Sequence, residues 1–289
     1  FLESIPASLE ARWNFSTDVP YRGHYNIVSK VDNVQDLGNF GNEFMPFLGE
    51  YIEGGVSIDI KMTTYDTGKD QVQVHFDLDD LLFRIPAIGW FKKAGSAGVA
   101  QVNLEIDESR IVNIPNFSVF SEDLRVNGSA AYAKNGTHLD IINIDQISFK
   151  RTDLAGVIIP GNDGGWTVSF HGPSLDLESS FENLFKVSND TNDVFNLKLS
   201  LSANVDKVWI DKKNFLKQIT GTLNRADNRW HGISIDGSLS SDEKFNVLLR
   251  PTGKDKRWVK IKTSDAGNML RTLDVYDTMI GGTLDVEAT

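Results

Sequence analysis

Apolar and polar residues alternate strictly in one short stretch of the sequence, Val56-Ser57-Ile58-Asp59-Ile60-Lys61-Met62. Successive side chains of a β-strand point to opposite faces of its sheet, so this stretch predicts a strand with one apolar and one polar face. The same alternation recurs at residues 72–78, 102–106, 197–201 and 233–239. We therefore predict a mainly β protein built from amphipathic strands.

Turn-forming sequences separate these strands. Asn135-Gly136 suits a two-residue hairpin, and residues 66–70, 161–165 and 252–255 are rich in Gly, Asn and Asp and suit slightly longer turns. Hairpin turns join neighbouring antiparallel strands, so we expect a mostly antiparallel sheet.

Helical periodicity is confined to three candidate segments, residues 36–50, 175–186 and 265–275, each with apolar residues along one side. Asp36 and Asp265 stand where an N-cap is needed, because a carboxylate there accepts hydrogen bonds from free N–H groups of the first turn. We expect these short amphipathic helices to cap the sheet.

Two of these helices belong to an internal repeat. Asp36 precedes the glycine pair Gly54-Gly55 by 18 residues, and Asp265 precedes Gly281-Gly282 by 16 residues. In each copy an alternating strand follows the glycines. The predicted unit is a strand, a capped helix, a glycine turn and a new strand.

The polar stretch 187–194 is a candidate boundary between β segments. It divides the chain into a first β-groove segment, residues 1–190, and a second, residues 191–289. The alternative is one continuous sheet with a long loop at this point. Because the second repeat copy closes the sequence, we expect the chain to be a segment of a longer protein.

Composition excludes several functional classes. The chain of 289 residues has 29 Lys and Arg against 40 Asp and Glu, a net charge of −11, which disfavours binding to a nucleic-acid backbone. It has no cysteine, which excludes disulfides, thiolate metal sites and cysteine nucleophiles. No apolar run approaches the roughly 20 residues of a membrane-spanning helix.

Catalytic and metal-binding motifs are lacking in the sequence. The five histidines are scattered, with no pair at ligand spacing, and no nucleophile-elbow pattern occurs. The acidic pairs Asp79-Asp80, Glu122-Asp123 and Asp242-Glu243 leave glycan hydrolysis as a minor alternative, because glycosidases need two carboxylates across the scissile bond. We expect no enzyme activity, no cofactor and no metal.

The apolar residues exceed what three short helices can cover. The chain has 17 Phe and 6 Trp besides its aliphatic strand positions. An apolar sheet face therefore needs a second sheet, further protein or an apolar ligand. The candidate groove-lining residues are Val56, Ile58, Ile60, Val74, Phe76, Leu197, Leu199, Leu201, Ile233 and Ile235.

Three strings in the sequence resemble the AsmA-like family of Gram-negative bacteria, the family of TamB and YhdP, and in particular its large alphaproteobacterial branch. The strings are Ile85-Pro86-Ala87-Ile88-Gly89-Trp90-Phe91-Lys92-Lys93-Ala94-Gly95, His171-Gly172-Pro173-Ser174-Leu175-Asp176-Leu177, and Lys262-Thr263-Ser264-Asp265-Ala266-Gly267-Asn268-Met269-Leu270 running on to Gly281-Gly282-Thr283-Leu284. With the repeat they span nearly the whole chain. The resemblance implies a long, curled, gutter-like sheet, a repeating β-groove with an apolar inside, in a periplasmic protein anchored in the inner membrane.

The resemblance further implies a non-enzymatic function in the cell envelope and in outer-membrane biogenesis. Phospholipid or another acyl-chain lipid would bind in the apolar groove and slide between the inner and outer membranes. The family offers no catalytic motif to compare. The alternative function is a structural scaffold whose sheet edge docks outer-membrane assembly proteins.

Overall fold

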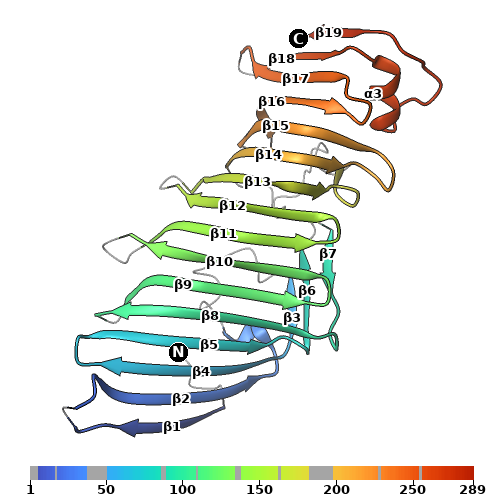
Figure 1. The fold of residues 1–289 in the computed structure, drawn as a ribbon. Helices are drawn as coiled ribbons and strands as arrows, with labels where there is room; N and C mark the ends of the chain where they lie inside the picture. Colours follow the sequence, from blue (N-terminus) through green and yellow to red (C-terminus); the bar gives the residue numbers. More distant parts are fainter. Residues whose placement is uncertain are drawn as a thin grey trace. The chain divides into compact units, whose positions relative to one another are not determined.

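The part of the chain that the structure describes forms an open, mostly antiparallel sheet of 16 strands that does not close into a barrel, which confirms the predicted mainly β class (Figure 1). The computed structural model describes residues 6–16, 18–37, 51–85, 89–108, 110–133, 138–161, 164–181, 198–226, 229–253 and 256–289.

Two compact units make up the chain, unit 1 (Phe1–Asp145) and unit 2 (Gln146–Thr289), and the division falls within strand β11 (Leu139–Phe149). The polar stretch 187–194, from which the sequence was divided near residue 190, lies outside the described residues.

Unit 1 carries the first strands of the large sheet and a separate small sheet. The large-sheet strands, in spatial order, are β1 (Ala7–Trp13), β2 (Tyr21–Val31), β4 (Val56–Tyr65), β5 (Lys69–Asp77), β8 (Gly98–Asp107), β9 (Arg110–Ser121) and β10 (Leu124–Tyr132). The small sheet consists of β3 (Ile52–Gly54), β6 (Leu81–Ile85) and β7 (Trp90–Lys92), and the 3₁₀ turn η1 covers Val34–Leu37.

The small sheet closes one end of the strands of unit 1 (Figure 1). Trp90 of β7 is buried, meets the ring of Phe83 edge-on at 5.2 Å, and donates from Nε1 to Asp123 at 2.9 Å. Asp123 lies between β9 and β10, so this bond joins the small sheet to the large one.

Buried Lys92 fixes the same end. Its Nζ donates to the carbonyl oxygens of Asp79, Leu81 and Lys93 at 3.0–3.2 Å. Burial lowers the pKa of Lys92, and nearby carboxylates, Asp79 foremost, oppose that shift. One side chain thus satisfies three backbone acceptors.

Unit 2 carries the remaining strands and a helix. The strands are β12 (Thr152–Pro160), β13 (Trp166–Asp176), β14 (Leu199–Trp209), β15 (Phe215–Ala226), β16 (Arg229–Leu239), β17 (Lys244–Pro251), β18 (Arg257–Thr263) and β19 (Leu284–Ala288), and the helix is α3 (Ala266–Thr272). β13 and β14 are parallel, whereas the other pairs in this unit for which a register is known are antiparallel. A parallel pair needs a crossover and not a hairpin, and the middle of the connection, residues 182–197, lies outside the described residues.

The three predicted helices have different outcomes. Asp265 caps α3 and accepts from the backbone N–H of Asn268 at 2.9 Å, as predicted. Of the segment 36–50, residues 38–50 lie outside the described part, and Asp36 belongs to the 3₁₀ turn η1. The helix predicted from Leu175 was wrong at its start, because Leu175 and Asp176 continue strand β13 and pair with Val208 and Trp209 of β14.

Both copies of the internal repeat return the chain to the strand that it left. After η1 the chain comes back as β4, with Val31 opposite Val56, and after α3 it comes back as β19, with Thr263 opposite Leu284. Gly54 has a φ of +105° and would place a Cβ at 2.5 Å from the carbonyl oxygen of Asp80. Glycine is therefore required at that turn.

A buried apolar cluster fills unit 2 beneath α3. Its buried members are Leu154, Val205, Val208, Ile210, Ile219, Leu239, Phe245 and Met269. Phenylalanine rings lie over glycines of the neighbouring strand in both units: Phe117 opposite Gly128, Phe170 opposite Gly156, and Phe245 opposite Gly237. The rings cover backbone that the glycines leave bare.

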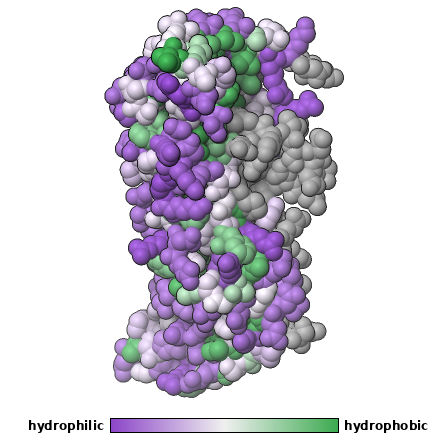
Figure 2. Space-filling view, turned by 90° about the vertical axis from the view of Figure 1, so that its right-hand side faces the viewer, coloured by the Kyte–Doolittle hydropathy of each residue, from purple (hydrophilic) through white to green (hydrophobic). Residues whose placement is uncertain are grey.

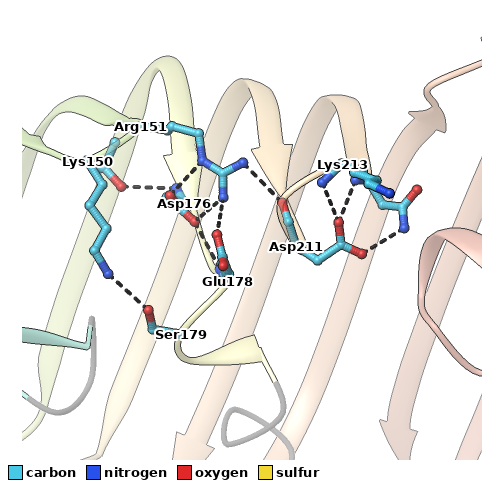
Figure 3. A network of polar contacts seen from close by, with 9 residues as sticks. Lys150, Arg151, Asp176, Glu178, Ser179, Asp211 and Lys213 are labelled. Atoms are coloured by element: carbon cyan, nitrogen blue, oxygen red, sulfur yellow. Dashed lines mark hydrogen bonds and ion pairs between the residues drawn. The ribbon is translucent and has the colours of Figure 1, made fainter.

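A polar network around Arg151 joins β12, β13 and the turn after β14 (Figure 3). Arg151 contacts Asp176 through two hydrogen bonds of 2.8 and 3.0 Å, Glu178 at 2.8 Å and the carbonyl oxygen of Asp211 at 3.1 Å. Its guanidinium also lies 4.4 Å from the ring centre of Trp209. Burial alone would raise the pKa of Asp176, but the bonds from Arg151 and from the N–H of Glu178 outweigh burial and lower it.

Candidate functional site

The candidate site in unit 1 is the apolar face of its sheet. Residues directly opposite each other on paired strands point to the same face, so the strand register places side chains in rows that cross the strands. One row comprises Leu9, Ile27, Ile60, Val74, Val102 and Phe117. The next comprises Ala7, Ser29, Ile58, Phe76, Ala100, Val119 and Val126, with one polar member.

A bulge keeps this face apolar where strand β9 would otherwise change sides. Phe117 pairs with Gly128 and Ile114 with Ala130, so four residues of β9 (114–117) span the same length as three of β10 (128–130). Pro115 lies within the extra step, where it has no N–H to donate to a ladder. Ile114 therefore faces the same side as Phe117 and is buried.

Unit 2 has apolar rows of the same kind across eight strands. One comprises Ile158, Val168, Leu201, Leu223, Ile233, Leu249, Val259 and Ala288. The adjacent row comprises Gly156, Phe170, Ala203, Gly221, Ile235, Val247, Ile261 and Val286. These four rows, two in each unit, are called the apolar rows below.

The opposite face of each unit is polar. In unit 1 one row comprises Glu10, Asn26, Lys61, Gln73, Asn103 and Asn116. In unit 2 one row comprises His171, Asn204, Thr220, Asp236, Asn246, Lys262 and Asp285. Neighbours bond across the strands, as Asn103 does to Asn116 at 2.8 Å and Asn246 to Asp236 at 2.9 Å. The two faces of each sheet thus differ sharply in chemistry.

Burial varies along the strands of unit 2. Val205, Leu239 and Phe245 lie near α3 and are almost completely buried. Leu201, Leu223 and Leu249, on β14, β15 and β17, lie toward the other end of the strands, away from α3, and remain partly exposed. The end of the apolar face near α3 is therefore packed as a core, whereas the end away from α3 keeps apolar surface in reach of solvent.

The structure places the predicted groove residues on these faces. Val56, Ile58, Ile60, Val74 and Phe76 share the apolar face of unit 1, and Leu199, Leu201, Ile233 and Ile235 share that of unit 2. Val56 and Ile233 are buried, and the others are partly exposed. Leu197 lies outside the described residues.

Sequence alternation missed other members of the apolar rows. Phe117 and Val119 belong to β9, whose bulge at Pro115 interrupts the period of two. Leu223 belongs to β15, whose register shifts between Lys217 and Thr220. In each strand a register shift interrupts the alternation of apolar and polar residues, so the period of two did not identify these positions although their side chains are apolar.

The acidic pairs have local structural partners. Asp79 accepts from the N–H of Gly98 at 2.9 Å, Asp123 accepts from Trp90, and Asp242 from Lys217 at 2.8 Å. Carboxylates of Asp77, Asp79 and Glu122 also line one hollow of about 420 Å³ in unit 1, beside His75. Within the described ranges, no group of three or more His, Asp or Glu side chains is arranged to hold a metal ion.

In the space-filling view of Figure 2, the hydrophobic residues of the described part form separate patches and not one broad surface. On the face that Figure 2 shows, hydrophilic residues dominate the described surface. In the part of the chain that the structure describes, no helix is both long enough and apolar enough to cross a bilayer.

Comparison of the chain with models of protein families, with curated proteins and with solved structures finds no match.

Proposed function

We propose that the chain is a non-enzymatic envelope segment that binds phospholipid acyl chains on its apolar rows and lets them move from strand to strand. The observation that supports this proposal is the continuity of the rows: in unit 2, one row is aliphatic at all eight strands that it crosses. The polar face behind it suits contact with water.

Apolar rows suit a sliding ligand for a physical reason. Each CH₂ group removed from water contributes about 0.8 kcal/mol, and this contribution has no preferred direction. Neighbouring strands are about 4.8 Å apart, so an acyl chain lying across them meets an equivalent side chain at each step. Binding can then be strong while movement along the row crosses only small barriers.

Location and partners in the cell follow from the resemblance to AsmA-like proteins. We propose a periplasmic position in a parent protein that is anchored in the inner membrane, with phospholipid as the ligand. The partly exposed end of the apolar face of unit 2, away from α3, supports a lipid position near Leu201, Leu223 and Leu249, since the end near α3 is filled by packed side chains.

Lipid retention by the purified chain tests the proposal. Native mass spectrometry with lipid extraction should find phospholipid on the wild-type chain, and Leu201→Asp should reduce its occupancy several-fold, because a carboxylate would be buried against the acyl chain. Ser202→Asp is the matched control, since Ser202 is the next residue and pairs with Thr222 on the polar face. Circular dichroism should show both variants folded.

Absence of phospholipid from the folded wild-type chain, or equal lipid loss in Leu201→Asp and Ser202→Asp, would contradict lipid binding on the apolar rows.

Trp166 provides an independent optical test. It pairs with Leu199 and therefore shares the face of Leu201 and Val168. Phospholipid brominated on its acyl chains should quench the tryptophan fluorescence of the wild-type chain more than that of Trp166→Phe. Equal quenching of both would place the lipid elsewhere.

A further inference from the structure

Basic residues gather at one end of the strands of unit 2, the end away from α3. The hairpins β15–β16 and β17–β18 turn there side by side, since β16 pairs with β17 (Figure 1). At these strand ends none of the described residues is acidic, in the ranges 224–226, 229–232, 249–253 and 256–259. The basic residues in these ranges, called the basic rim below, are Arg225, Arg229, Arg250, Lys256 and Arg257. The rest of the two turns, with Asp227, Lys254 and Asp255, lies outside the described residues.

This local excess of positive charge stands in a chain whose net charge is −11. Near α3 the basic side chains have acidic partners, as Lys217 has in Asp242 at 2.8 Å. In the part of the chain that the structure describes, no carboxylate lies within ion-pair distance of Arg229, Arg250 or Arg257. The end away from α3 therefore attracts anions.

Strand register brings the basic rim next to the apolar rows. Arg225 follows Leu223 of β15 by two residues, and Arg257 precedes Val259 of β18 by two residues. Alternate residues of a strand point to the same face and lie about 6.7 Å apart. On both strands, a guanidinium group thus comes directly after an aliphatic member of the apolar row, on the same face.

Tryptophan residues lie at the boundary between the two chemistries. Trp230 pairs with Arg225, and the guanidinium lies 5.5 Å from the centre of its ring. Leu199 pairs with both Trp166 and Arg225, so Trp166 shares this face. Tryptophan combines a large apolar ring with one N–H donor, and it is enriched where lipid acyl chains meet their headgroups.

We propose that the basic rim binds the phosphate of a phospholipid with net negative charge, while its acyl chains lie on the apolar rows of unit 2. This inference rests on the proposed function and adds the class of headgroup and its position. A guanidinium group presents N–H donors in a planar fork that can hold a phosphate by two parallel hydrogen bonds. Basic residues at four successive strand ends also offer the phosphate a cation at each step of about 4.8 Å across the sheet.

Arg229 and Arg257 are the residues to change. Arg229 is exposed and Arg257 is partly exposed, whereas Arg225 is only 7% exposed and has further contacts whose loss would affect folding. The double variant Arg229→Gln/Arg257→Gln removes two positive charges from the rim and keeps side chains that can form hydrogen bonds.

Competition between lipids with identical acyl chains tests the proposal. Native mass spectrometry of the wild-type chain, given equal amounts of phosphatidylglycerol and phosphatidylethanolamine, should show phosphatidylglycerol retained about tenfold better, because its net charge is negative. The double variant should retain both phospholipids about equally. Diacylglycerol, which has no phosphate, should be retained equally by the wild-type chain and the variant, since the apolar rows are unchanged.

Lys212→Gln/Lys213→Gln is the matched control. It removes two exposed positive charges from the turn after β14, at the α3 end of the same unit, and should keep the preference for phosphatidylglycerol. Added salt should weaken this preference in the wild-type chain, because it screens exposed charges. Circular dichroism should show both double variants folded.

The outcomes separate this inference from the proposed function. Equal retention of both phospholipids by the wild-type chain, an unchanged preference in the rim variant, or equal loss in the control would overturn the basic rim as the headgroup site and leave lipid binding on the apolar rows intact. Displacement of phosphatidylglycerol by inorganic phosphate would assign the rim to free phosphate and would also overturn it. If the wild-type chain retains neither phospholipid nor diacylglycerol, the proposed function fails and this inference fails with it.

Discussion

Unit 1 and unit 2 present similar apolar faces but close one end of their strands by different means. Unit 1 uses the small sheet, in which buried Trp90 and Lys92 are held by hydrogen bonds to Asp123 and to three backbone carbonyl groups. Unit 2 uses α3 and a cluster of aliphatic and aromatic side chains. The alternating residues of the strands therefore determine which face of each sheet is apolar. The small sheet in unit 1 and α3 in unit 2 determine how one end of that face is covered.

The largest expected effect comes from removing the aromatic anchor of unit 1. Trp90→Ala should destabilise that unit by about 3–5 kcal/mol, through the lost ring contacts and the cavity left behind. Leu239→Ala is the counterpart in unit 2, where Leu239 is completely buried, with a cost of about 2–5 kcal/mol. Hydrogen exchange read by mass spectrometry should locate each loss in its own unit, and spread of either loss through both units would break the comparison.

Disruption of the Arg151 network should cause the next largest loss of stability. Arg151→Met should cost about 2 kcal/mol, because it leaves the nearly buried carboxylate of Asp176 without its cation while Arg151 itself is partly exposed. Urea unfolding of both proteins measures the difference. Lys217→Met, which removes an exposed pair with Asp242 in the same unit, is the control and should change stability by less than about 1 kcal/mol.

Stability of unit 2 should also fall in acid because of Asp176. Its pKa is lower in the folded chain than in the unfolded chain, so the folded state binds the proton more weakly. The resulting stabilisation is present above the unfolded pKa of about 3.9 and is lost as pH falls through the folded value. Asp176→Asn should flatten this part of the pH profile, and an unchanged profile would exclude the carboxylate as its source.

Removal of the buried ammonium group should have a smaller effect. Lys92→Met should destabilise unit 1 by about 1–2 kcal/mol, since three carbonyl groups lose their donor while the cost of burying a charge is also removed. Amides near Leu81 should exchange faster in the variant. Unchanged exchange there would show that the hydrogen bonds of Lys92 do not stabilise this end of unit 1.

The helix cap of unit 2 should give the smallest change. Asp265→Ala removes the acceptor for the N–H of Asn268 and should cost about 1 kcal/mol. Asp265→Asn should recover most of this loss, because asparagine caps helices about as well as aspartate does. Thermal unfolding separates the two variants, and equal destabilisation by both would point to charge and not to capping.

Much of the fold and of the candidate face could be predicted from the sequence. Alternation at residues 56–62 and 72–78 identified β4 and β5 and the face that each presents. The cap at Asp265 was visible as well, because capping depends on residues three positions apart. The parallel pairing of β13 with β14 was not predicted, since Leu175 and Asp176 read equally well as the first turn of a helix.

The sequence by itself determined the amphipathic strands and their apolar and polar faces, because side-chain alternation is a local property of extended backbone. Only the tertiary structure decided the strand neighbours, the bulge that returns Ile114 to the apolar face, and the burial of Lys92. These depend on partners distant in the chain: β10 for Ile114, and the carbonyl oxygens of Asp79 and Leu81 for Lys92. The alternation of apolar and polar residues depends on one strand at a time, so it does not show which distant residues that strand contacts.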